Sequence, residues 1–177
     1  MKRIVWQRLD RFARNLVPLA LTLALLLFSL VPLHIPGYAA IIPMLVLISV
    51  YYWAIHRPRL VPPLAVFAIG LAQDALSGAP FGFHAVVLLL AYGAVVSQRR
   101  FFLGKSFLVV WWGFMLVAFG AALASWVLAS AFNGAVIGPR AAVFQFLLTL
   151  AFYPIVIWIF LPAQRVIPRQ ARDVPRP

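Results

Sequence analysis

Long apolar segments, separated by short groups of proline, glycine and basic residues, recur along this chain of 177 residues. Each is close to the ~20 residues that a helix needs to cross the ~30 Å hydrocarbon core of a bilayer. None shows the period-2 alternation of transmembrane barrel strands. The pattern predicts an all-α, polytopic integral membrane protein with six spans, at residues 16–33, 39–55, 61–76, 83–97, 107–132 and 141–161.

Two polar segments flank this predicted transmembrane domain, which covers residues 16–161. Residues 1–15 place apolar side chains on one side of a helical wheel and arginines mostly on the other. Such a helix is expected to lie along the inner membrane surface, attracted by anionic lipid and by apolar burial. Residues 162–177 are rich in proline and arginine, and we expect a flexible cytoplasmic tail there. No repeat or second domain is apparent.

The distribution of charge predicts the orientation of the helices. Apolar residues make up 65% of the chain and charged residues 10%, which is a membrane-protein composition. Of the 15 Lys and Arg residues, all but Arg140 lie in the two flanking segments or in the second and fourth connections. The positive-inside rule then places both termini in the cytoplasm, and the net charge of +12 reflects topology and not nucleic-acid binding. Four tryptophans expected in the inner headgroup layer agree with this orientation: Trp53, Trp111, Trp112 and Trp158.

Residues able to perform catalysis are scarce. The chain has no cysteine and three acidic residues, of which only Asp74 lies within a predicted span. The histidines, His34, His56 and His84, fall in separate connections or helix ends without metal-binding spacing. A two-carboxylate mechanism or a metal site cannot be built from this set. We therefore expect a protein that is not an enzyme and that holds no metal or cofactor.

Asp74 is the residue whose position most requires an explanation. An ionisable group within a span is costly, and this one falls in the last turn of the third predicted helix, at the negative end of the helix dipole. We expect Asp74 either to pair with Arg140 or to hydrogen-bond around the Ser77–Gly78 turn. A purely structural role, in which the carboxylate caps and orients the hairpin, is an equal alternative.

Glycine and proline shape the segment around Asp74. Gly70 lies one helical turn before Asp74 on the same face, where a small residue allows close helix packing. Gly78, Pro80 and Gly82 follow and predict a tight turn into the fourth span.

The segment Gly70-Leu-x-x-Asp74-x-Leu-x-Gly78-x-Pro80-x-Gly82 resembles a motif of the bacterial MreD family of rod shape-determining proteins. So does the preceding aromatic run through Trp53 into the Arg57–Pro58 turn, and the resemblance covers most of the chain. Phe81 stands where the family pattern has leucine, a mild apolar exchange.

The resemblance implies a non-enzymatic component of the bacterial inner membrane that serves cell elongation. Its implied partners are MreC and, through the complex, the actin-like MreB, the glycosyltransferase RodA and a class B penicillin-binding protein, together with membrane lipids. The implied fold is that of the substrate-binding subunits of energy-coupling-factor transporters. The implied role is to support side-wall peptidoglycan synthesis and so to maintain rod shape.

One other function remains open at this point, and a third is excluded. A small-molecule-binding subunit of a membrane transporter would need convergent polar groups at the outer end, and the candidates are Gln73, Asp74, His84, Asn133 and Arg140. Ala20 and Ala24 supply one small-residue face on the first span for such a subunit. An enzyme acting on a lipid-linked wall precursor lacks a second acid or base.

Overall fold

The computed structural model describes residues 17–29, 42–58 and 60–166, the side chains of residues 161–166 excepted. Within these ranges the chain forms helices and connections, without any strand. The helices are Val17–Ser29, α2 (Leu45–His56), α3 (Pro63–Ser77), α4 (Phe83–Phe102), α5 (Phe107–Asn133) and α6 (Arg140–Val166). The predicted all-α class is thus confirmed for the described residues.

Helix boundaries differ from the predicted spans at three places. Helix α2 begins at Leu45, because Pro43 disfavours helical geometry at Ile42 and residues 42–44 are not helical. Helix α4 continues through Arg99 and Arg100 to Phe102, and the two arginines suit the negative end of its dipole. Helix α6 continues through residues 162–166, which corrects the predicted start of a flexible tail. Residues 1–15 and 167–177 lie outside the described residues.

The length and composition of three helices suit a membrane span: α4, α5 and residues Arg140–Phe160 of α6. The Val17–Ser29 helix, α2 and α3 are apolar but shorter, at 10–17 residues each. The structure therefore supports a membrane protein. The six-span topology and the cytoplasmic termini remain predictions.

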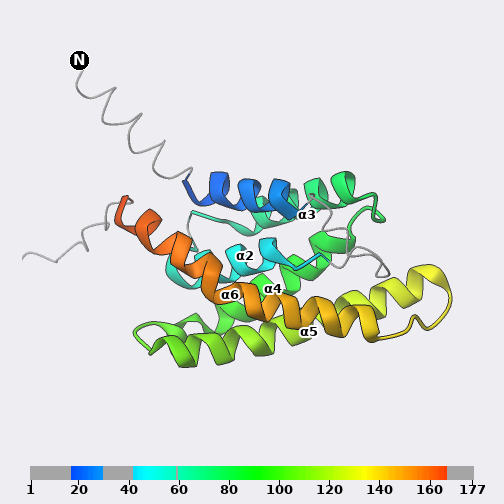
Figure 1. The fold of residues 1–177 in the computed structure, drawn as a ribbon. Coiled ribbons are helices and arrows are strands. Elements are labelled where there is room, and N and C mark those ends of the chain that lie inside the picture. The colour runs from blue at the N-terminus through cyan, green and yellow to red at the C-terminus, as the bar shows by residue number, and fades with distance from the viewer. Residues whose placement is uncertain (1–16, 30–41, 59, 167–177) are drawn as a thin grey trace, which may run out of the picture.

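Helix α2 is the centre of the bundle (Figure 1). It packs against α4, α5 and α6, and every one of its residues except His56 is buried. Trp53 is 0% exposed and its ring packs on Phe160, so the prediction that it lies in the headgroup layer is wrong. By contrast, Trp158 on α6 is 79% exposed.

Polar side chains hold neighbouring elements to α2 and to the segment before it. Because competing water is absent from a bilayer core, such interhelical hydrogen bonds fix helix positions, each contributing about 0.6–2 kcal/mol. They are Thr22 Oγ1 with Ser49 Oγ at 2.7 Å, Tyr51 Oη to Val110 O at 2.7 Å, Arg99 Nε to Ile55 O at 2.8 Å, Gln145 Nε2 to Ile42 O at 2.9 Å and Met44 N to Thr149 Oγ1 at 2.9 Å.

The bundle has two ends of different charge. We call the end with the α2–α3 and α4–α5 connections the basic end, and the end with the α3–α4 and α5–α6 connections the hairpin end (Figure 1). Among the Lys and Arg side chains that the structure describes, Arg57, Arg99, Arg100 and Lys105 are at the basic end and Arg140 is at the hairpin end. This arrangement matches the charge asymmetry expected from the sequence.

Candidate functional site

The hairpin of α3 and α4 is built on a backbone contact at Gly70. A Cβ added to Gly70 would lie 2.3 Å from Ala85 Cα and 2.7 Å from Ala85 N, so only a hydrogen fits between the two helices here. Ala85 is itself fully buried. The predicted close packing is therefore present, and the partner of Gly70 is the first turn of α4.

The turn between the helices depends on two left-handed glycines. Gly78 ends α3 with φ of 69°, and Gly82 precedes α4 with φ of 93°, a region that side chains other than glycine rarely adopt. Between them Pro80 accepts a hydrogen bond of 3.1 Å from Phe83 N. The chain thus reverses within a few residues, as the Gly-Pro-Gly pattern predicts.

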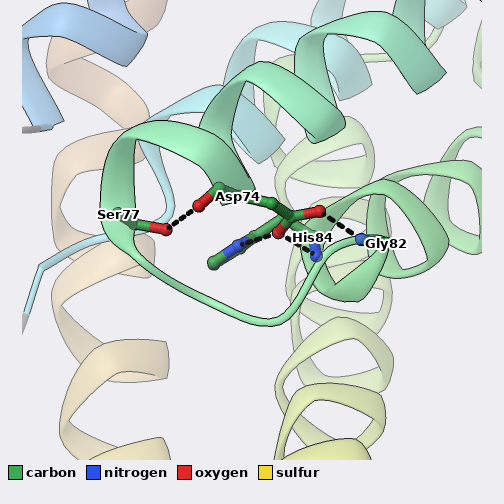
Figure 2. A network of polar contacts seen from close by, with 4 residues as sticks. All are labelled: Asp74, Ser77, Gly82 and His84. Atoms are coloured by element: carbon green, nitrogen blue, oxygen red, sulfur yellow. Dashed lines mark hydrogen bonds and ion pairs between the residues drawn. The ribbon is translucent and has the colours of Figure 1, made fainter.

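Asp74 lies inside this hairpin and is 0% exposed. Its Oδ2 accepts a hydrogen bond from Gly82 N at 2.9 Å, and its Oδ1 accepts one from His84 N at 2.8 Å (Figure 2). Oδ1 also lies 2.7 Å from His84 Nδ1. Because backbone N–H groups donate to both oxygens, we assign the proton of this third bond to Nδ1. Ser77 Oγ bonds the backbone carbonyl of Asp74, at 3.5 Å, and not its carboxylate.

The carboxylate acts as the N-terminal cap of α4. Gly82 has no side chain with which to cap the helix, and Asp74 supplies the missing acceptor from the preceding helix. The positive end of the α4 dipole thereby offsets the unfavourable position of Asp74 at the negative end of α3. This geometry explains how a buried acid is tolerated at that position.

The predicted pair between Asp74 and Arg140 is not formed. In the part of the chain that the structure describes, the carboxylate of Asp74 contacts the ring of His84, while Arg140 is exposed in the first turn of α6. The alternative expectation, hydrogen bonding around the turn, agrees better with the structure, although the donors are Gly82 and His84 and not the Ser77–Gly78 corner. The three donors already satisfy the carboxylate.

The other predicted site residues lie elsewhere. Trp53, Arg57 and Pro58 are at the basic end, where Arg57 N donates to Trp53 O at 2.7 Å and Pro58 O accepts from Tyr92 Oη at 3.5 Å. They lie at the end of α2, and the α3–α4 turn lies at the other end of the bundle (Figure 1).

The polar candidates for a transporter pocket are partly used in other contacts. Asn133 donates to Ala129 O within its own helix, and Arg140 is exposed. The Oε1 atom of Gln73 is buried without a hydrogen-bond partner in the described structure. His84 lines a pocket at the hairpin end, together with Ser125 and Gln145, two residues that the sequence did not single out.

The arrangement suits a structural role better than acid–base chemistry. Asp74 is the one acidic residue that the structure describes, and its oxygens are occupied by three donors. The described ranges contain no group of three or more His, Cys, Asp or Glu residues able to hold a metal ion. The network can orient two helices, but it offers no second acid for proton transfer.

Comparison with protein families gives one match. The family model described as rod shape-determining protein MreD matches residues 10–162, which include the α3–α4 hairpin and the aromatic α2. The chain belongs to the MreD family. Membership supports a role in rod shape determination and agrees with the apolar helices of a membrane protein. The MreD family is one of shape-determining components and is not described as an enzyme family.

No match was found among curated proteins or among solved structures. The expected likeness of this MreD-family chain to the substrate-binding subunits of energy-coupling-factor transporters therefore stays a prediction.

Proposed function

We propose that this MreD-family chain is a non-enzymatic, multi-pass subunit of the bacterial inner membrane that binds MreC. Through that complex it would serve MreB, RodA and a class B penicillin-binding protein, and so support peptidoglycan synthesis along the side wall. Six crossings with both termini in the cytoplasm are part of the proposal.

The observation that carries the proposal is the family match over residues 10–162, joined to the way the chain uses its polar groups. The only described acid caps a helix, and the interhelical hydrogen bonds bind helices to each other. Hydrogen bonds of this kind fix the helices relative to one another and leave large apolar side chains on the outside of the bundle. Such an exterior is available to partner helices.

The outer face of α5 supports the same proposal. Large apolar side chains recur on it at intervals of three or four residues and are about half exposed or more: Leu108, Trp112, Leu116, Phe119, Leu123 and Val127. The opposite face of α5 is buried through small residues such as Ala118 and Ala121. One side of this helix thus belongs to the bundle and the other is open to lipid or to a partner.

Co-isolation in a gentle detergent tests the proposal. The tagged chain is purified from the cell that natively produces it, and copurifying proteins are identified by mass spectrometry. Recovery of MreC and the wall-synthesis enzymes supports the proposal. Recovery of ATP-binding-cassette subunits instead would make the chain a transporter subunit.

Matched glycine variants sharpen this test. Gly70→Leu places a large side chain against the backbone of Ala85, so we expect loss of the complex while the protein is still inserted in the membrane. Gly93→Ala adds a methyl group to α4 where nothing lies within 4 Å, so the complex should persist. An intact complex and normal rod shape in the Gly70 variant would contradict the proposed role of the hairpin.

A further inference from the structure

A pocket of about 250 Å³ opens at the hairpin end, between α4, α5 and the start of α6. Its lining includes Phe83, His84, Ser125, Trp126, Ala141 and Gln145. One wall is fixed by the α5–α6 connection, because Trp126 Nε1 donates to Ile137 O at 2.8 Å. The pocket is therefore a formed feature of the bundle and not a gap between unattached segments.

The pocket contains a polar group without a partner. Ser125 is 8% exposed, and its Oγ makes no hydrogen bond within the described structure. It does not bond His84 either, so the Asp74–His84 pair is not extended into a nucleophilic triad. A buried hydroxyl that lines a pocket and lacks a partner marks a place where a ligand atom can bind.

The electrostatic character of the pocket favours an anion. The first turn of α6 forms part of the wall through Ala141 and Ala142, and their N–H groups have no acceptor within the helix, since the helical bonds begin with Val143 N to Pro139 O. A helix of 27 residues presents the positive end of its dipole here. Arg140 precedes Ala141 in the same turn; it is exposed and does not line the pocket, and it is the one described Lys or Arg at this end.

The neighbouring acid, Asp74, does not line the pocket. Asp74 is buried and is bonded to three donors, one of them Nδ1 of His84. With Nδ1–H donating to Asp74, Nε2 of a neutral imidazole is an acceptor, so His84 is not among the groups assigned to the phosphate.

A second pocket adjoins the first and has a different character. It also measures about 250 Å³, lies between α5 and α6, and shares Trp126 and Ala142 with the first. The rest of its lining is apolar and includes Leu123 and Val143, which are about half exposed on the outside of the bundle. A ligand that fills both pockets needs a polar anionic part and a hydrocarbon part.

We propose that the hairpin-end pocket binds the phosphate headgroup of an anionic lipid, with the first turn of α6, Arg140 and Ser125 holding the phosphate and the lipid chain lying in the apolar pocket. The proposal goes beyond the partner-binding function and does not depend on it.

Native mass spectrometry of the full chain tests the proposal with defined probes. The delipidated protein is offered phosphatidylglycerol, diacylglycerol with the same chains, or inorganic phosphate, and the bound fraction is measured. We expect phosphatidylglycerol to be retained about tenfold better than diacylglycerol, because charge-assisted hydrogen bonds to the phosphate are then formed. Equal retention of the two lipids would overturn the proposal, as would inorganic phosphate that binds as tightly as the lipid.

Variants locate the site. Arg140→Gln alters an exposed side chain and should lower phosphatidylglycerol retention about tenfold, and Ser125→Ala should lower it several-fold. Ser97→Ala removes an exposed hydroxyl that bonds Ala94 O on α4 and serves as the matched control, with retention equal to that of the native chain. Retention that is unchanged in both site variants, or lowered equally in the control, would overturn the assignment.

Discussion

The contact between Gly70 and Ala85 gives the sharpest prediction of stability. Substitution Gly70→Ala adds a single carbon, whose ideal position is 2.3 Å from Ala85 Cα. Carbon atoms in ordinary contact lie about 3.5–4.0 Å apart, so α3 must move away from α4 by more than about 1 Å. The atoms in the way belong to backbone and cannot rotate aside.

The same displacement stretches the Asp74 network, which lies one turn along the same face. Its hydrogen bonds measure 2.7–2.9 Å, and an added ~1 Å takes them beyond the usual limit of about 3.2 Å. Overpacking costs about 1–3 kcal/mol, and weakening hydrogen bonds to a charged group costs about 1.5–3 kcal/mol. Together these costs lower the expected free energy of unfolding of Gly70→Ala by about 2.5–6 kcal/mol.

Unfolding in mixed micelles with a rising fraction of sodium dodecyl sulfate measures this change. Gly93→Ala is the matched control, because its added methyl group meets nothing within 4 Å and should leave the midpoint unchanged or slightly raised. Coincident unfolding curves for Gly70→Ala, Gly93→Ala and the native chain would show that the close contact between Gly70 and Ala85 does not limit stability.

Further substitutions separate the remaining contacts. Asp74→Asn should lower the free energy of unfolding by about 2–4 kcal/mol, because an amide donor then faces a backbone N–H. Arg140→Gln should change the free energy of unfolding by less than about 0.5 kcal/mol. Equal effects of the two substitutions in a thermal-shift assay would indicate that Asp74 does pair with Arg140. Tyr51→Phe removes the hydroxyl bond to α5 and should cost about 1 kcal/mol in the micelle assay, and no loss would show that the bond contributes nothing. In Gly113→Ala the added carbon meets the far edge of the Phe102 ring and the Tyr51 hydroxyl, which are ends of side chains and not backbone. It should therefore destabilise the protein less than Gly70→Ala does, and the reverse order would contradict this ranking.

The helices could be predicted because hydrophobic length and Pro-Gly punctuation determine them directly. The ranges of α3 and α5 differ from the predicted spans by at most two residues. The turn at Gly78, Pro80 and Gly82 could be predicted for the same reason, since a left-handed conformation selects glycine.

Contacts between helices could not be read from the sequence in the same way. Every span is apolar all round, so hydrophobicity does not tell a lipid-facing residue from one in the centre of the bundle. Trp53 was therefore expected in the headgroup layer, although it lies in the central helix. The contact of Asp74 with His84 depends on how the hairpin folds back, and opposite charge alone pointed to Arg140.

Replacement of the native gene by variants of the hairpin tests whether the α3–α4 hairpin is needed for binding of MreC and for rod shape. Cell width and the amount of MreC recovered with the tagged chain are measured together for the native sequence, Gly70→Leu and Gly93→Ala, each checked for insertion in the membrane fraction. We expect rod-shaped cells and full MreC recovery for the native chain and Gly93→Ala, and rounded cells with little MreC for Gly70→Leu. Rod-shaped cells without any MreC bound to the native chain would contradict this expectation.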